Sequence, residues 1–274
     1  MGGWPVLPKP AEWQEFYAQF KRKTGLDLDL YKANQLQRRI ISMAGQHQCK
    51  SLGEFAQWVN ATPMNTEWFL DRLAINVSEL FRNPEKWTEM EKDILPLLLK
   101  GTPRLKIWSA GCSYGAEAHS LAMILDKKFP GSHRILGTDI DTAALNQAKS
   151  GLFSKNDLRC VPKEYREYLV ESGAEFQADD RLKKYLSFQK GNLLADRFET
   201  GFDLIMCRNV VIYFTEEAKD ELYEKFFRSL KPGGILFVGS TERITRSGEI
   251  GFSAAKPFYY QKPIAGEKAW RNAS

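Results

Sequence analysis

A glycine-rich turn between a short apolar run and a helical segment carries the clearest chemical signal in this sequence. Leu105–Trp108 is apolar apart from one lysine, Gly111 and Gly115 flank a break in the pattern, and apolar residues recur at helical spacing after Ala116. A strand, a glycine turn and a helix in this order form the first unit of an open α/β sheet. Such a turn lets a ligand approach backbone that carries little side chain. We therefore predict a ligand site at this turn.

A carboxylate follows the second predicted strand. Asp139 lies about one βαβ half-unit beyond the glycine turn, where an acidic side chain commonly accepts hydrogen bonds from the two hydroxyls of a ribose. A carboxylate in this place could instead cap the next helix. Asp141 fits that cap better, which leaves Asp139 available for a ribose.

Two classes of ligand fit the turn. It reads G-x-S-x-G from Gly111 to Gly115, not the G-x-G-x-x-G of dinucleotide sites. A dinucleotide would place its pyrophosphate at the helix N-terminus, whereas S-adenosylmethionine carries a cationic sulfonium and no phosphate. Glu117 would repel a phosphate and favours the cationic ligand. The same carboxylate could simply complement the helix dipole, so both ligands stay open on this residue alone.

The G-x-S-x-G pattern is also typical of the nucleophile elbow of α/β-hydrolases. That site needs an acid and then a histidine downstream of Ser113. The histidines are His47, His119 and His133, and none follows the second predicted strand. A hydrolase triad therefore has no candidate base, and the sequence argues against this activity.

Further polar residues are candidates for the same site. The segment Asn76–Pro84 contains Arg82, whose rigid fork of donors suits a carboxylate. Arg208 and Asn209 end an apolar strand, where open α/β sheets bind ligands and where unsatisfied polar groups are costly. Asn192 follows the third main strand and could contact an adenine edge. We expect these side chains to meet in one pocket.

The elements that must position these residues are a group of helices followed by an α/β sheet. Residues 11–75 show helical spacing of apolar residues and no β pattern. The predicted strands are Leu105–Trp108, Arg134–Gly137, Leu186–Gln189, Phe202–Cys207, Gly234–Gly239 and an antiparallel Pro257–Gln261. The predicted helices of the sheet region are Ala116–Lys128, Thr142–Gly151 and Glu216–Leu230, the last ended by Lys231–Gly234.

The chain divides accordingly. We predict a flexible leader at 1–10, a helical N-terminal domain at 11–75, a linker and connecting helix at 76–100, and the sheet domain at 101–263. A small β insertion is expected within about 155–190, and residues 264–274 form a tail.

Composition bounds the function further. The 274 residues are enough for two domains, and a net charge of +5 is too mild to indicate nucleic acid. Four scattered cysteines without a C-x-x-C pair favour reduced thiols in the cytoplasm. The longest apolar run is too short to span a bilayer, the start lacks a signal-peptide pattern, and no metal site is predicted.

Taken together, these residues resemble the CheR-type chemotaxis receptor methyltransferases from about Phe20 to Gln261. The matches are N-x-[TS]-x-[FL]-[FY]-R at Asn76–Arg82, W-S-A-x-C-S-x-G-x-E at Trp108–Glu117, D-I-D at Asp139–Asp141, N-L-L at Asn192–Leu194, C-R-N-V-x-I-Y-F at Cys207–Phe214 and L-F-V-G-S-T-E at Leu236–Glu242.

This resemblance implies a Rossmann-like S-adenosylmethionine methyltransferase sheet with an all-helical N-terminal domain. Its acceptors would be glutamate side chains on the cytoplasmic helices of a chemoreceptor, and its product S-adenosylhomocysteine. Arg82 and Tyr213 would lie closest to the methyl transfer, and the basic pair Arg38 and Arg39 would dock the receptor. The cofactor pocket would be lined by Asn76, Ser78, Arg82, Gly111, Glu117, Asp139, Asn192, Leu193, Arg208 and Asn209.

One departure and two alternatives accompany this resemblance. The turn continues Ala116-Glu117-Ala118-His119 where the family usually has E-E-P-Y, so we expect His119 to change the pocket wall. A non-catalytic S-adenosylmethionine sensor or scaffold could use the same fold. So could a methyltransferase acting on another protein.

Overall fold

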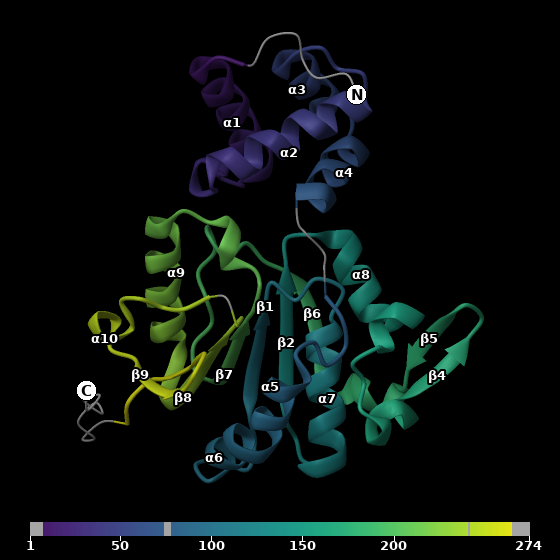
Figure 1. Cartoon of the computed structure of the whole chain (residues 1–274), viewed down its shortest axis with the longest axis vertical. Coiled ribbons are helices and arrows are strands. Elements are labelled where there is room, and N and C mark those ends of the chain that lie inside the picture. The colour runs from purple at the N-terminus through teal and green to yellow at the C-terminus, as the bar shows by residue number, and fades with distance from the viewer. Residues whose placement is uncertain (1–7, 74–77, 241, 265–274) are drawn as a thin grey trace.

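The computed structural model describes residues 8–73, 78–240 and 242–264. A helical domain stands over one end of a seven-stranded sheet, and a small β insertion projects from the side of the sheet domain (Figure 1). Asn76 of the predicted pocket, most of the predicted leader and nearly all of the predicted tail lie outside the described residues.

The helical domain packs around an aromatic core. Its helices are α1 (Pro10–Thr24), α2 (Ala33–Gln46), α3 (Leu52–Ala61) and α4 (Pro63–Leu73), with a 3-10 turn at Leu28–Leu30. Phe16 and Phe20 of α1 lie on one helical face and pack with Phe69 of α4. The predicted helix start at Ser51 is confirmed, because its hydroxyl accepts the Glu54 N–H at 3.2 Å.

The sheet has the strand order β6-β2-β1-β7-β8-β10-β9. Its strands are β1 (Lys106–Ala110), β2 (Arg134–Asp139), β6 (Leu186–Lys190), β7 (Phe202–Cys207), β8 (Leu230–Val238), β9 (Ser253–Lys256) and β10 (Tyr259–Gln261). The first five are parallel, and β10 runs antiparallel to β8 as predicted. A second antiparallel strand, β9, completes this edge and was not predicted.

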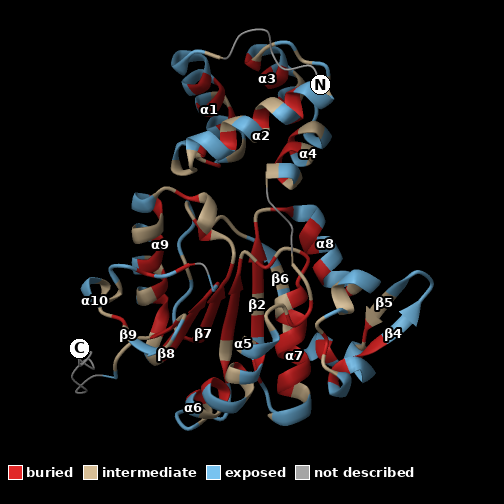
Figure 2. Ribbon diagram, viewed as in Figure 1, coloured by how far each residue is buried: buried red, intermediate tan, exposed pale blue. Residues whose placement is uncertain are grey.

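Residues along the central strands alternate between two cores. Ile107 and Leu204 face one core with α7 (Ala116–Lys128), and Trp108 and Ile205 face the other with α9 (Glu216–Ser229). Because both faces are covered, the strands read as nearly continuous apolar runs. Figure 2 shows the central strands and α7 largely in the buried colour. The helix α8 (Thr142–Ser150) contacts β2 and β6.

Two connections differ from the sequence predictions. The connecting helix consists of α5 (Pro84–Glu89), a π turn (Met90–Ile94) and α6 (Leu95–Leu99). It is longer than predicted and continues past Lys92. Pro96 has no N–H for the regular helical ladder, which accounts for the wider turn before it. The predicted helix end before Lys231 is confirmed, because α9 ends at Ser229. The predicted strand start at Gly234 was wrong, because β8 begins at Leu230 and includes Lys231–Gly234 with a register shift opposite β7.

The insertion is a three-stranded antiparallel sheet of β3 (Leu152–Ser154), β5 (Glu175–Ala178) and β4 (Leu169–Ser172). It starts before the predicted range, and the segment after Tyr185 belongs to the main sheet as β6. Asp126 of α7 accepts hydrogen bonds from the hydroxyls of Tyr168 and Tyr185, and it pairs with Lys184 at 2.7 Å. These contacts join the insertion to the back of α7. Short α10 (Ser247–Ile250) follows β8.

None of the helices in residues 8–73, 78–240 and 242–264 is both long and apolar enough to cross a membrane. Among the same residues, no three His, Cys, Asp or Glu side chains are grouped so that they could hold a metal ion.

Candidate functional site

A pocket lies where the strand order reverses. The chain leaves β1 toward β2 on one side and leaves β7 toward β8 on the other, so the loops after β1 and β7 diverge at the carboxyl ends of the strands. The pocket between them encloses about 1000 Å³ of space, including its open mouth. The predicted residues that line it are Ser78, Arg82, Gly111, Glu117, Asp139, Asn192, Leu193, Arg208, Asn209 and Tyr213.

The glycine turn is shaped by backbone bonds to the second strand. The N–H groups of Gly111 and Cys112 both donate to the Thr138 carbonyl, at 2.8 and 2.9 Å. Gly111 has a φ of +72°, and a Cβ on it would lie 2.5 Å from a methyl carbon of Val210. Glycine is therefore required here both by conformation and by the close approach of the loop after β7.

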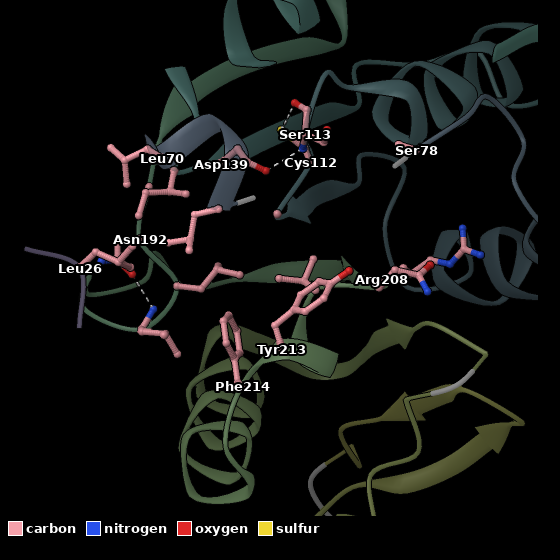
Figure 3. A pocket seen from close by; sticks show the side chains of 18 of the residues that line it. Leu26, Leu70, Ser78, Cys112, Ser113, Asp139, Asn192, Arg208, Tyr213 and Phe214 are labelled. Atoms are coloured by element: carbon pink, nitrogen blue, oxygen red, sulfur yellow. Dashed lines mark hydrogen bonds between the residues drawn. The ribbon is translucent and has the colours of Figure 1, made fainter. Parts of the chain in front are cut away.

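Asp139 is hydrogen-bonded to the backbone of the glycine turn. Its carboxylate accepts the Ser113 N–H at 2.7 Å and the Asp141 N–H at 3.0 Å (Figure 3). Burial raises the pKa of Asp139 although these backbone donors oppose the shift. Each oxygen keeps lone pairs for a further donor, which suits a vicinal diol in the pocket. Asp141 caps α8 through the N–H groups of Ala143 and Ala144, which confirms the predicted cap.

Glu117 and Arg208 form a buried pair. The Glu117 carboxylate accepts from the Arg208 guanidinium at 2.6 Å, and the Arg208 side chain is fully buried. The same guanidinium also donates to the Asn83 side chain at 2.9 Å and to the Arg82 carbonyl at 3.3 Å. Both predicted cofactor ligands thus line the pocket while balancing each other's charge. Their pairing fixes the backbone beside Arg82.

His119 lies elsewhere than expected. Its ring stacks against Phe188, and its Nδ1 lies 2.9 Å from the Gly115 carbonyl. It borders a separate cavity between α7 and the insertion, and it is absent from the described residues that line the main pocket. The expected change to the pocket wall was therefore wrong. Burial lowers the pKa of His119 to about 4, so the imidazole is neutral at physiological pH.

The helical domain supplies a wall of the pocket that sequence reasoning missed. Leu26, Tyr31, Leu70 and Leu73 line it on that side. Leu70 and Leu73 are one helical turn apart on α4, and this spacing was the available signal for a shared face. Figure 3 shows Tyr213 and Phe214 projecting from the segment opposite Asp139 and Ser113.

A groove adjoins the pocket at Tyr213. It encloses about 920 Å³ of space, including its open side, and it shares Tyr31, Leu73 and Tyr213 with the pocket. Its polar wall comes from α2 and the residue before it, with Lys32 and Arg39 as the cations. Arg39 is half-buried there, whereas its neighbour Arg38 is exposed and is not among the described residues of the groove.

Backbone bonds join the helical domain to the segment that carries Tyr213. The Lys32 N–H donates to the Tyr213 carbonyl at 2.9 Å, and the Thr215 N–H donates to the Leu30 carbonyl at 2.9 Å. Tyr31 and Phe214 form an isolated antiparallel bridge between these bonds. These bonds therefore fix the groove wall relative to the segment that carries Tyr213.

Tyr213 has the protonation state of a hydrogen-bond donor. Burial raises the pKa of its hydroxyl, and the charges of Arg39 and Arg82 act against this shift. The hydroxyl is therefore protonated near neutral pH. The two arginines that influence it border the groove and the pocket respectively.

Comparison with known proteins gives the family. The all-alpha domain of CheR methyltransferases matches residues 11–74, and their SAM binding domain matches residues 76–257. A chemotaxis protein methyltransferase of Listeria monocytogenes is 39% identical over 94% of this chain and 99% of its own. Those of Borreliella burgdorferi and Escherichia coli are 30% and 28% identical, over 87% and 86% of this chain and 89% and 87% of theirs.

These matches confirm the predicted cofactor and fold. S-adenosylmethionine is the cofactor, and the residues that line the pocket are compatible with it: the Asp139 carboxylate can accept from hydroxyl groups, and Leu193, Ile140 and Phe214 offer apolar surface. The relatives place the protein in chemotaxis as a methyltransferase. The chain belongs to the CheR methyltransferase family.

Proposed function

We propose that this protein is a cytoplasmic protein-glutamate O-methyltransferase that forms methyl esters on the cytoplasmic helices of a chemoreceptor. The observation that carries the proposal is the groove beside the pocket, with Lys32 and Arg39 on its wall and Tyr213 at the junction. A glutamate side chain on a helix is an acidic group on a flexible stem. Such a side chain could extend past Lys32 and Arg39 and place its carboxylate beside Tyr213.

The chemistry needs orientation more than proton transfer. Near neutral pH a glutamate carboxylate is already ionised, so no general base is required. S-adenosylmethionine supplies the electrophilic methyl group. The chain's part is to align the carboxylate with it and to remove water around the nucleophile. The apolar residues of the helical domain that border the pocket support this exclusion of water.

Arg82 and Tyr213 have separate roles in this proposal. Arg82 lines the pocket, and the Arg208–Glu117 pair fixes the backbone beside it. Its guanidinium orients the carboxylate and the charged end of the cofactor. The protonated Tyr213 hydroxyl donates to one acceptor oxygen, which leaves the other oxygen free to attack. Asn76 would complete the pocket, as the resemblance implies.

The direct test is transfer of labelled methyl groups from S-adenosylmethionine to receptor cytoplasmic fragments. We expect label that is released as methanol in mild base, because methyl esters are base-labile. A receptor fragment with its acceptor glutamates replaced by alanine is the control. Base-stable label would exclude a carboxylate acceptor. Cofactor binding without any transfer would favour the sensor or scaffold.

Two adjacent arginines provide a matched test of the groove. Arg39→Ala should lower kcat/KM for the receptor about 10- to 100-fold, because a charged hydrogen-bond partner contributes roughly 1.5–3 kcal/mol. Arg38→Ala, which removes an exposed charge one position away on α2, should have a smaller effect through general attraction to an acidic surface. Equal losses in both variants would mean that the groove does not take the acceptor.

A further inference from the structure

Glu242 is a buried carboxylate behind the segment that carries Tyr213. It is 4% exposed and borders a separate cavity with Val211 and Tyr223, on a side of the segment other than the cofactor pocket. Among the described residues that line the cofactor pocket, Glu242 does not occur. Its charge therefore needs an explanation other than direct ligand contact.

Three backbone N–H groups converge on this carboxylate. One oxygen accepts from the Asn209 N–H at 2.7 Å and from the Gly239 N–H at 2.8 Å. The other oxygen accepts from the Val211 N–H at 3.1 Å. These donors lie just beyond the ends of β7 and β8, where the ladder of the parallel sheet has stopped. Without Glu242 they would be buried and unpaired.

The backbone on either side has little freedom to adjust. Asn209 has a φ of +60°, and the chain then enters the 3-10 turn Val211–Tyr213. Val210 packs against the glycine turn at Gly111, so the segment is held in front by the cofactor loop and behind by Glu242. A Cβ on Gly239 would collide with the Glu242 carboxylate and lie 3.0 Å from the Asn209 nitrogen. The contact thus leaves no room for a side chain at Gly239.

We propose that Glu242 is a positioning residue for methyl transfer: its carboxylate anchors Asn209 and Val211 and so sets the place of the Tyr213 hydroxyl. The proposal rests on the role of Tyr213 given under the proposed function. Glutamine cannot replace Glu242, because its NH2 group would face an N–H that the second oxygen now accepts. A carboxylate has acceptor oxygens on both sides and satisfies all three donors.

A double-mutant comparison tests this role. Glu242→Gln should lower kcat at least 10-fold. The KM for S-adenosylmethionine should change less than kcat, since Asp139 and Asn192 are untouched and Asn209 is the predicted cofactor contact that Glu242 holds. In a Tyr213→Phe background the same change should lower kcat by no more than about 2-fold, because the group that Glu242 positions is already gone. Glu242→Asp, which keeps both acceptor oxygens, should recover part of the activity. The matched control is Glu249→Gln, an exposed carboxylate on α10.

Amide hydrogen exchange gives a readout that does not depend on activity. Exchange at residues 209, 211 and 239 should become faster in Glu242→Gln and stay unchanged in Glu249→Gln, while circular dichroism shows both variants folded. Gly239→Ala perturbs the same contact without removing its charge, and it should show the same dependence on Tyr213.

Three outcomes would overturn the proposal: unchanged kcat in Glu242→Gln, equal losses in the two Tyr213 backgrounds, or unchanged exchange at the three amides. Failure of the proposed function would look different. The wild-type chain would then transfer no methyl group to receptor fragments, while the exchange experiment would still report on the anchor.

Discussion

The buried carboxylates at the strand ends differ from the partly exposed carboxylate that joins the insertion to α7. At the strand ends, Asp139 and Glu242 accept backbone N–H groups, and burial raises the pKa of each despite those bonds. Burial also acts to raise the pKa of Asp126 on α7. There the donors Lys184, Tyr168 and Tyr185 outweigh it, so the pKa lies below its ordinary value. Ionisation of Asp139 and Glu242 therefore lowers the free energy of unfolding, whereas ionisation of Asp126 raises it.

This difference gives the two regions opposite responses to pH. A raised folded-state pKa means that the ionised carboxylates of Asp139 and Glu242 reduce the free energy of unfolding as pH rises through those values. A lowered pKa means that Asp126 contributes stability above its unfolded pKa and loses it as pH falls through the folded one. The strand ends are organised for binding, and the insertion contact for stability.

The largest expected effect concerns the strand-end region. Arg82→Ala should lower kcat/KM for methyl transfer about 100-fold or more, because under the proposed function it removes the charged donor that orients the acceptor carboxylate. The kcat/KM of Arg82→Lys should lie between the values of wild type and Arg82→Ala, since a point charge cannot make a forked contact. Labelled methyl transfer measures both variants. Arg72→Ala, an exposed arginine over Trp68, is the control, and full activity in Arg82→Ala would contradict the assignment.

A smaller effect should separate two neighbouring acids. Asp139→Ala should weaken S-adenosylmethionine binding about 10- to 100-fold, as expected for the loss of roughly 1–3 kcal/mol of charged hydrogen bonding. Asp141→Ala removes the cap of α8 and should lower stability by about 1 kcal/mol with little change in affinity. Calorimetry and denaturant unfolding measure the two quantities. Equal affinity in the two variants would count against a ribose at Asp139.

At the insertion contact, loss of a carboxylate should lower stability and leave activity unchanged. Asp126→Asn should lower the free energy of unfolding at pH 7 by about 1–2 kcal/mol, because the amide cannot accept from three donors as a carboxylate does. The kcat at saturating substrate should be unchanged. The difference from wild type should begin to narrow as pH falls below about 4, where the unfolded-state carboxylate takes up a proton, and should close below the lowered folded-state pKa. Urea unfolding at several pH values checks this, and a gap that widens in acid would refute it.

The smallest effect is expected for an exposed ion pair that joins the π turn before α6 to strand β9. Asp93 and Lys256 form an ion pair at 2.6 Å in which both side chains are well exposed to solvent. Asp93→Asn should leave the urea midpoint and the activity unchanged, because solvent screens such pairs. A clear shift of the midpoint would contradict this expectation and show that an exposed ion pair stabilises the protein without burial.

Much of the fold could be predicted because it follows local rules. The glycine turn at Gly111, the cap at Asp141 and the apolar strands each follow from a short stretch of sequence. The start of β8 could not, since a proline and two glycines conceal a strand that pairs through a register shift. Nor could β9, since its four residues include no buried apolar side chain. The extent of the insertion was also missed, because β3 is only three residues long.

The site was predicted as a set of residues but not as a set of contacts. Arg208 and Glu117 are 91 positions apart, and no local pattern shows that they neutralise each other. His119 was expected in the pocket wall, yet it lies on the face of α7 that turns toward the insertion. Which face a helical residue occupies depends on what covers the helix. Sequence spacing alone does not fix that.

The bridge between Tyr31 and Phe214 has a consequence for how such an enzyme can diversify. The bonds beside it join main-chain atoms, so they depend on backbone path and not on side-chain identity. Outward-facing residues of the helical domain can therefore be exchanged during evolution without displacing the tyrosine across the junction. Under the proposed function, the surface that recognises a receptor could therefore change while the geometry around Tyr213 is kept, so one site could be matched to receptors with different surfaces.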